Sequence, residues 1–274
     1  LDRSLSVSSP TESHVRKAIV MKGQSLKQLG RIDEAMATFG NGLQVVGEDP
    51  ELRFQLAMLL ANQNRPGEAR LHYEAIPDSP PEYFSSFDVG ILGAKKHFNL
   101  GGVCMAMGDY AGAKHYWRMA ATSGAGFLPA AQMLFEKSIE REDFRTGREA
   151  LQLLEQLDGR GEVWADAVEV YAYSQKIDPA EQFQQLISQQ PGDAKANLAL
   201  YRCYLKHGRE QEAEPLLSSL SRAGVPQAPF YAGVNALRNG KISEALEYML
   251  TAEKLDPGNA ATREQVALLQ GMMK

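Results

Sequence analysis

Apolar and small residues recur along this chain at the spacing of paired α-helices that are separated by tight turns. In the clearest example, Leu100 and Cys104 lie one helical turn apart before Gly108, and Ala113 and Trp117 follow it. Because residues four apart lie on one face of a helix, each side of Gly108 presents one apolar face. A small residue such as Ala113 lets the two helices approach closely. The pattern predicts a helix, a turn at Gly108 and a second helix.

The same pattern returns about every 34 residues, with one longer interval. Most of the turn positions are followed within five residues by Ala or Gly and within nine by a large apolar residue. The sequence therefore predicts an all-α fold, a right-handed solenoid of about seven helical hairpins. The predicted turns are Gly30, Asn64, Gly108, Glu142, Lys176, Gly208 and Gly240.

The repeat pattern also suggests how the chain is organised. Residues 12–258 are expected to form one superhelix, and residues 259–274 a single amphipathic helix that covers its last apolar face. Residues 1–11 lack the basic start and apolar middle of a signal peptide. We interpret them as a linker from an upstream domain that is absent from this chain.

At the turn and packing positions the chain resembles the tetratricopeptide repeat, a helical hairpin of about 34 residues. The resemblance extends from about Thr11 to Pro257 and is clearest at residues 99–120 and 239–259. The fourth and fifth repeats are degenerate, since Gly147 replaces the usual Ala and Asp178-Pro179 shortens the fifth turn. The resemblance implies a protein–protein or substrate-docking module that binds a peptide or a partner domain in a concave groove. It implies no catalytic activity of its own.

The first helix of each repeat is expected to line this groove. Large apolar side chains would hold a bound segment, and cationic and amide side chains would orient it. Several of the aromatic rings could instead belong to the core. The predicted groove residues are Phe54, Met58, Lys95, Phe98, Asn99, Arg202 and Phe230.

The long interval, 44 residues from Asn64 to Gly108, contains an insertion at residues 77–93. Three prolines and two glycines prevent a continuous helix through it. Its aromatic residues either pack the loop on neighbouring helices or contact a ligand or domain at the mouth of the groove. The candidate contact residues are Tyr83, Phe84, Phe87, Asp88 and His97.

Residues 87–100 also resemble the segment that joins repeats in bacterial tetratricopeptide regions following a family 2 glycosyltransferase domain. Residues 1–8 and 12–18 are similar to the tail of such a domain. This resemblance implies an alternative function, the acceptor-recognition part of a glycosyltransferase whose catalytic domain is absent from the chain. The Asp-x-Asp motif with which that family binds its metal has no counterpart in the sequence.

Composition and motifs narrow the chemistry further. The 29 Lys and Arg residues are interspersed among 34 Asp and Glu, for a net charge of −5, which disfavours a nucleic-acid partner. The sequence contains no phosphate-binding loop, dinucleotide fingerprint, Cys-x-x-Cys or His-Glu-x-x-His motif. We therefore expect no catalytic residues, no cofactor and no metal, and interpret Cys104 and Cys203 as buried thiols.

The apolar stretches of the sequence are short. The longest of them fall well below the roughly 20 residues that a membrane-spanning helix needs. No membrane span is expected, and the cytoplasm is the expected location.

Overall fold

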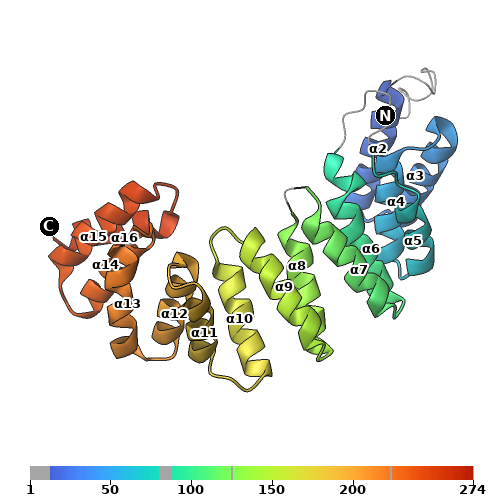
Figure 1. Cartoon of the computed structure of the whole chain (residues 1–274). Coiled ribbons are helices and arrows are strands. Elements are labelled where there is room, and N and C mark those ends of the chain that lie inside the picture. Colours follow the sequence, from blue (N-terminus) through green and yellow to red (C-terminus); the bar gives the residue numbers. More distant parts are fainter. Residues whose placement is uncertain (1–12, 80–87, 125, 223, 274) are drawn as a thin grey trace. The chain divides into compact units, whose positions relative to one another are not determined.

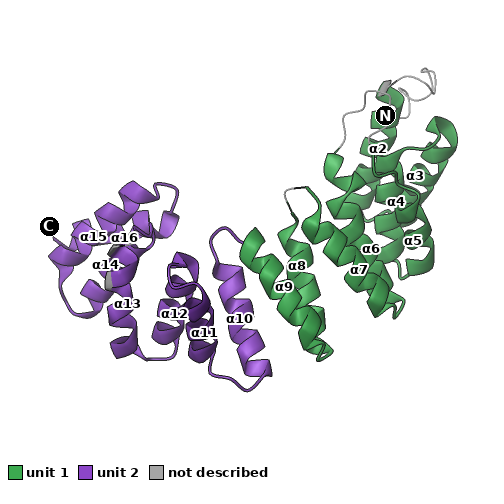
Figure 2. Cartoon of the chain, viewed as in Figure 1, with its two compact units in different colours: residues 1–157 green, residues 158–274 purple. Residues whose placement is uncertain are grey.

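The computed structural model describes residues 13–79, 88–124, 126–222 and 224–273. Within these residues the regular elements are all helical, and they form seven hairpins followed by a last helix (Figure 1). The predicted all-α solenoid of helical hairpins with a C-terminal helix is thus confirmed. The chain divides into two compact units, Leu1–Leu157 and Asp158–Lys274, called unit 1 and unit 2 below (Figure 2). The sequence pattern alone had suggested one superhelix over residues 12–258.

Unit 1 contains the first four hairpins and a short 3-10 helix that precedes the third of them. In each hairpin the first helix packs on the second, and within unit 1 the second helix of each of the first three hairpins packs on the first helix of the next. The helices are α2 (Ser13–Gln28), α3 (Ile32–Val46), α4 (Pro50–Asn62), α5 (Pro66–Glu74), η1 (Val89–Leu92), α6 (Ala94–Ala106), α7 (Tyr110–Thr122), α8 (Leu128–Glu140) and α9 (Phe144–Leu157).

Unit 2 contains three hairpins and the final helix. Val266 and Leu269 of that helix are buried against Ala245 and Met249 of the last hairpin, so it covers the apolar face that the hairpin would otherwise expose. The helices are α10 (Glu162–Ser174), α11 (Pro179–Gln189), α12 (Ala194–Lys206), α13 (Glu210–Arg222), α14 (Ala228–Arg238), α15 (Ile242–Leu255) and α16 (Ala260–Met272).

All seven predicted turn residues have a left-handed backbone, with φ between 55° and 79°. At Gly108 the N–H donates to the Met105 carbonyl at 3.0 Å, and the N–H of Asp109 donates to the Cys104 carbonyl at 2.8 Å. These two bonds satisfy carbonyls that the end of α6 leaves free, as in a Schellman motif. Glycine adopts this conformation without strain, which explains why it occupies most of the turns.

Glycines within the first helices allow the hairpins to close. A Cβ atom at Gly101 would lie 2.2 Å from Nε1 of Trp117, and one at Gly23 would lie 2.3 Å from the ring of Phe39. Trp117 and Phe39 belong to the second helices and are almost fully buried. The close approach is therefore between a glycine on one helix and a large apolar side chain on the other.

The insertion is anchored to α6 at both of its described ends. The Lys96 ammonium donates to the Ile76 carbonyl at 3.0 Å and pairs with Asp78. At the other end Asp88 accepts a hydrogen bond from the Gly90 N–H at 2.9 Å and so caps η1. Ile91 and Leu92 of η1 are buried in the core of unit 1.

None of the described helices combines the length and the hydrophobicity that crossing a membrane requires.

Candidate binding grooves

A cavity of about 400 Å³ in unit 1 lies along the first helices of three consecutive hairpins, α4, α6 and α8. Side chains of α5 and α7 complete its walls. We call it the unit 1 groove. Its lining includes Met58, Asn62, Phe98, Asn99, Gly102, Met105, Met133 and Lys137.

Two residues of α6 are held in place at the groove by their own contacts. The Phe98 ring packs edge-on against Phe127, with ring centroids 5.4 Å apart. The backbone carbonyl of Phe98 accepts a hydrogen bond from Nε1 of Trp117 at 3.2 Å. The side-chain amide of Asn99 donates to the Lys95 carbonyl at 2.9 Å. That bond orients the amide and leaves its oxygen free to accept a hydrogen bond from a ligand.

The apolar part of the groove is rich in methionine. Met58, Met105 and Met133 come from α4, α6 and α8, and all three side chains are partly exposed. Methionine has an unbranched, polarizable side chain that adapts to differently shaped partners. This lining suits a segment with a large apolar side chain and does not require one fixed shape.

Two lysines border the apolar lining. Nζ of Lys27, near the end of α2, lies 4.0 Å from the Met58 sulfur, and no carboxylate in the described part of the chain pairs with it. Lys137 lines the groove and pairs with Glu140 at 2.7 Å. The Lys27 ammonium is thus available to an acidic group next to the groove.

Gly102 stands in the middle of α6 with open space where a side chain would be. A Cβ atom there would meet no atom within 4 Å, in contrast to the neighbouring Gly101. Glycine in a helix interior is about 1 kcal/mol less favourable than alanine. No contact among the described residues requires a glycine at position 102.

Three of the predicted groove residues of unit 1 lie together: Met58, Phe98 and Asn99 all line the cavity. Phe54 is a core residue, buried and packed edge-on against Tyr73 with ring centroids 5.5 Å apart. Lys95 pairs with Asp88, beside the start of η1. The sequence pattern missed two lining residues, Met105 and Lys137. Met105 follows Gly102 by three residues, so the apolar face of α6 was a signal for it. The sequence held no such signal for Lys137.

The aromatic residues predicted to act in the insertion, Tyr83, Phe84 and Phe87, lie outside the described residues. His97 is described, and it is buried on α6 with its ring stacked on Tyr116 at a centroid distance of 6.2 Å. Burial, and next the nearby Lys96, lower the pKa of His97, so it is neutral at physiological pH. His97 therefore belongs to the packing between α6 and α7.

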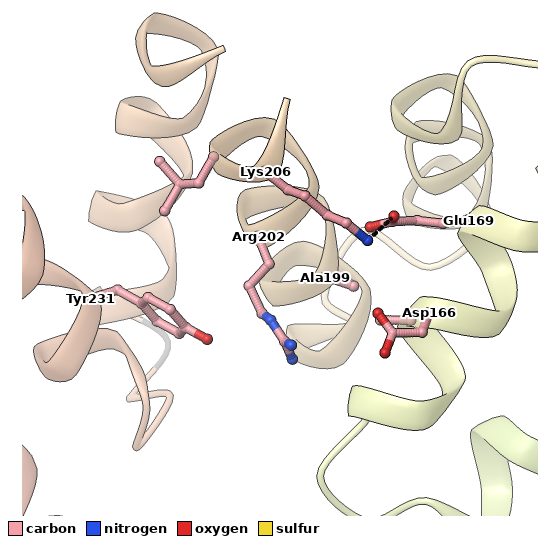
Figure 3. Close-up of a pocket in the computed structure, with 8 residues that line it drawn as sticks. Asp166, Glu169, Ala199, Arg202, Lys206 and Tyr231 are labelled. Carbon is pink, nitrogen blue, oxygen red and sulfur yellow. Dashed lines mark hydrogen bonds and ion pairs between the residues drawn. The ribbon is translucent and has the colours of Figure 1, made fainter. Parts of the chain in front are cut away.

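A smaller cavity, about 230 Å³, lies within unit 2 on the first helices α10, α12 and α14. We call it the unit 2 pocket. Figure 3 shows the Arg202 side chain reaching into the space between Tyr231 and Asp166, with Lys206 turned toward Glu169. Four of the eight lining residues are charged.

Ion pairs fix part of this pocket. Nζ of Lys206 lies 2.6 Å from the buried Glu169 carboxylate, and Arg202 approaches Glu162 only to 3.9 Å. Burial raises the pKa of Tyr231, which keeps its hydroxyl neutral. Glu162 is thus a distant partner for Arg202, and the Arg202 side chain is about one-third exposed. Its guanidinium can therefore bind a carboxylate of a ligand.

Of the two groove residues predicted in unit 2, Arg202 lines the pocket and Phe230 does not. The Phe230 ring packs edge-to-face on Tyr231 at 5.6 Å and against the core of the last hairpin. Tyr231, the next residue, faces the pocket instead. The predicted residue and the residue that lines the pocket are therefore neighbours on α14.

Two segments of the chain match sequence models of the same family. Residues 20–83 and residues 180–234 each match a model described as a tetratricopeptide repeat. The chain contains tetratricopeptide repeats in these two segments. Such repeats form protein-binding modules. Neither of the two models describes a glycosyltransferase.

Solved structures resemble this chain at low sequence identity. A repeat protein from Parabacteroides merdae is 12% identical, with 93% of this chain and 98% of that chain covered and a TM-score of 0.49. The C-terminal part of a repeat-containing protein from Cytophaga hutchinsonii is 16% identical, with 90% and 99% covered and a TM-score of 0.44. YrrB, described as having an unusual peptide-binding site, is 18% identical, with 82% and 96% covered and a TM-score of 0.33. No curated protein is similar enough to count as a match.

Proposed function

We propose that the unit 1 groove binds a peptide segment of a partner protein, and that this segment carries a large apolar side chain next to an acidic one. The observation that carries the proposal is the cavity of about 400 Å³ along α4, α6 and α8, with methionines and Phe98 on its walls. A cavity of this size and lining is typical of sites for apolar side chains.

Gly102 supports a ligand that comes close to the α6 backbone. The residue lowers helix stability by about 1 kcal/mol relative to alanine, and open space surrounds it. A side chain at this position would occupy the cavity itself. Glycine keeps that volume free for a bound segment.

Charge favours an acidic residue in that segment. The Lys27 ammonium lies beside Met58, at the edge of the groove, without a carboxylate partner in the described part of the chain. An acidic side chain placed there gains a charge-assisted hydrogen bond. The free oxygen of the Asn99 amide can accept a backbone N–H of the same segment.

Selection from a random peptide library on the immobilised full chain tests the proposal. We expect the selected peptides to share a large apolar residue adjacent to Asp or Glu. The affinity of a labelled peptide for Gly102→Leu should fall about 100-fold, or about 2.7 kcal/mol, because the new side chain fills the groove. Replacing the acidic residue of the peptide by its amide should weaken binding to the wild type more than to Lys27→Gln.

Gly40→Leu is the matched control. Gly40 also lies inside a helix, α3, where a Cβ atom meets nothing within 4 Å, and it is remote from the groove lining. This variant should bind the peptide as tightly as the wild type does. The proposal is wrong if the library yields no binding peptide, or if the selected peptides bind Gly102→Leu and the wild type equally.

A second proposal rests on the resemblance of residues 87–100 to glycosyltransferase-associated repeats. Within this segment Asp88 and Lys95 pair with each other, which holds its described start against α6. We infer an acceptor-recognition role for these repeats beside a family 2 glycosyltransferase domain. The coding sequence upstream of Leu1 tests this: a sugar-nucleotide domain in the same reading frame supports the role, and its absence contradicts it.

A further inference from the structure

A glutamate, a cysteine and a histidine meet on one side of unit 2. Glu169 lies on α10, Cys203 lies on α12, and His207 directly follows α12. One potential ligand atom from each residue lies within 4.8 Å of the other two. Thiolate, imidazole and carboxylate are the donors that Zn²⁺ takes in proteins.

The helix geometry explains why these side chains converge. Cys203 and His207 are four residues apart, so they lie one helical turn from each other on the same face. Glu169 comes from the preceding hairpin, whose first helix contacts α12. Metal sites between packed helices use this arrangement, in which one helix supplies two ligands and its neighbour supplies a third.

Neighbouring side chains already orient two of the three groups. Nε2 of His207 lies 3.1 Å from the Tyr173 hydroxyl, and the two rings pack edge-to-face. A second partner of this kind fixes the imidazole of a metal-binding histidine and leaves the other nitrogen for the metal. Lys206 donates to Oε2 of Glu169 at 2.6 Å, and no hydrogen bond to Oε1 is found among the described residues.

We propose that Glu169, Cys203 and His207 bind one Zn²⁺ ion, with water as the fourth ligand. The sulfur and nitrogen donors favour Zn²⁺ over Mg²⁺ or Ca²⁺, which prefer oxygen. Bonds of about 2.0–2.3 Å place ligand atoms about 3.5 Å apart, so the three side chains close by about 1 Å on binding. His207 is exposed and Cys203 is buried, which gives the ion an entry path from solvent.

Only the thiolate form of cysteine binds a metal, so binding of Zn²⁺ at this site displaces the thiol proton of Cys203 to solvent.

Titration of the purified full chain with Co²⁺, a spectroscopic substitute for Zn²⁺, tests the proposal. We expect equimolar binding with an intense near-ultraviolet band from thiolate to metal, and displacement of Co²⁺ by Zn²⁺. Cys203→Ala and His207→Ala should each weaken binding by about 100-fold or more, since even outer partners of metal ligands contribute about 10–100-fold. Tyr173→Phe should weaken it about tenfold.

Cys104→Ala is the matched control, because Cys104 is the other buried free thiol of the chain and lies on α6 of unit 1. It should keep the band and the affinity of the wild type. His207 is exposed, so His207→Ala is expected to fold even if Cys203→Ala does not, and circular dichroism checks this. Absence of a thiolate band in the wild type, or a band that survives in Cys203→Ala or His207→Ala, overturns the proposal.

Discussion

The unit 1 groove and the unit 2 pocket are lined by equivalent positions of the repeat, and yet unit 2 carries four charged side chains where the unit 1 lining is mainly apolar. Gly102 and Arg202 both lie six residues before a turn glycine, and both line their cavities. The same holds for three further pairs: Asn99 with Ala199, Met105 with Leu205, and Ala106 with Lys206. The scaffold therefore decides where a cavity forms, and the side chains at a few fixed positions decide what it accepts.

The residue that precedes Gly102 or Arg202 also differs between the two units, and with it the packing of the hairpin. Gly101 lies against Trp117 of the second helix, whereas Tyr201, at the equivalent place in unit 2, is buried and packs edge-to-face on Tyr231 at 5.3 Å. Leu217 of α13 stands where Trp117 stands in α7. In these two hairpins the first helix carries glycine where the second helix carries the larger indole, and tyrosine where the second helix carries leucine.

The largest effect is expected for Gly101→Ala, which tests this packing in unit 1. The added Cβ would lie 2.2 Å from Nε1 of Trp117. Because the indole is almost fully buried and cannot move away, the variant should lower the free energy of unfolding by about 2–3 kcal/mol. Urea denaturation followed by circular dichroism measures this difference.

Gly102→Ala is the control for that experiment, since it makes the same chemical change one residue further along α6. Its Cβ meets open space, so alanine should stabilise the helix by about 1 kcal/mol. If both variants shift the urea midpoint in the same direction, the close approach of Gly101 to Trp117 does not determine the stability of this hairpin.

The second prediction converts the chemistry of one cavity into that of the other. Gly102→Arg places in the unit 1 groove the residue that unit 2 carries at position 202. Arginine suits a helix better than glycine does, so the fold should persist. Its side chain should fill the groove and lower the affinity for an apolar and acidic peptide about 30-fold, or about 2 kcal/mol, as measured by fluorescence anisotropy. Unchanged affinity would separate the peptide site from the groove.

The third prediction concerns an ionisable residue between α8 and α9 of unit 1. Asp143, one residue after the fourth turn, accepts hydrogen bonds from Lys114 and the Thr146 hydroxyl, both at 2.8 Å. The bond from Lys114, and next the bonds from Thr146, outweigh burial and hold the pKa of Asp143 well below its usual value. The equivalent residue of the fifth hairpin, Ile177, cannot titrate.

A lowered carboxyl pKa stabilises the fold above the unfolded value of about 3.8, and this contribution is lost as the pH falls toward the folded value. Asp143→Asn should therefore lower the stability by about 1–2 kcal/mol at pH 7 and by much less near pH 2. Amide hydrogen exchange in α8 and α9 at the two pH values measures the difference. A destabilisation that is equal at both pH values would assign it to shape and not to charge.

The sequence predicted the turns well because their cause is local. A left-handed residue between two helices requires glycine or a tolerated substitute, and small and apolar residues follow at fixed distances. The groove was predicted only in part. Phe54 and Met58 lie four residues apart on α4, and yet the first is core and the second faces the groove, because Tyr73 of α5 covers Phe54. The alternation of apolar residues cannot reveal which face a neighbouring helix covers.

The cluster of Glu169, Cys203 and His207 was missed for a related reason. Its members match no contiguous motif, because Glu169 and Cys203 belong to adjacent hairpins. Tyr173 and His207, which are 34 residues apart, contact each other for the same reason. A search for chemically related residues separated by about one repeat would have been the signal that finds such a site.

The smallest effect is expected at the turn that precedes α11 in unit 2. Lys176 has φ of 59°, whereas Gly208 and Gly108 fill the equivalent turns with φ of 69° and 79°. A side chain other than that of glycine is strained there, although glycine also gives the unfolded chain more freedom. Lys176→Gly should thus stabilise unit 2 by about 0.5–1 kcal/mol, and Gly208→Ala should destabilise it by a similar amount. Urea denaturation of both variants tests the pair, and Lys176→Ala controls for loss of the lysine charge. Stabilisation by Lys176→Ala equal to that by Lys176→Gly would mean that charge, and not backbone strain, distinguishes this turn from the glycine turns at Gly108 and Gly208.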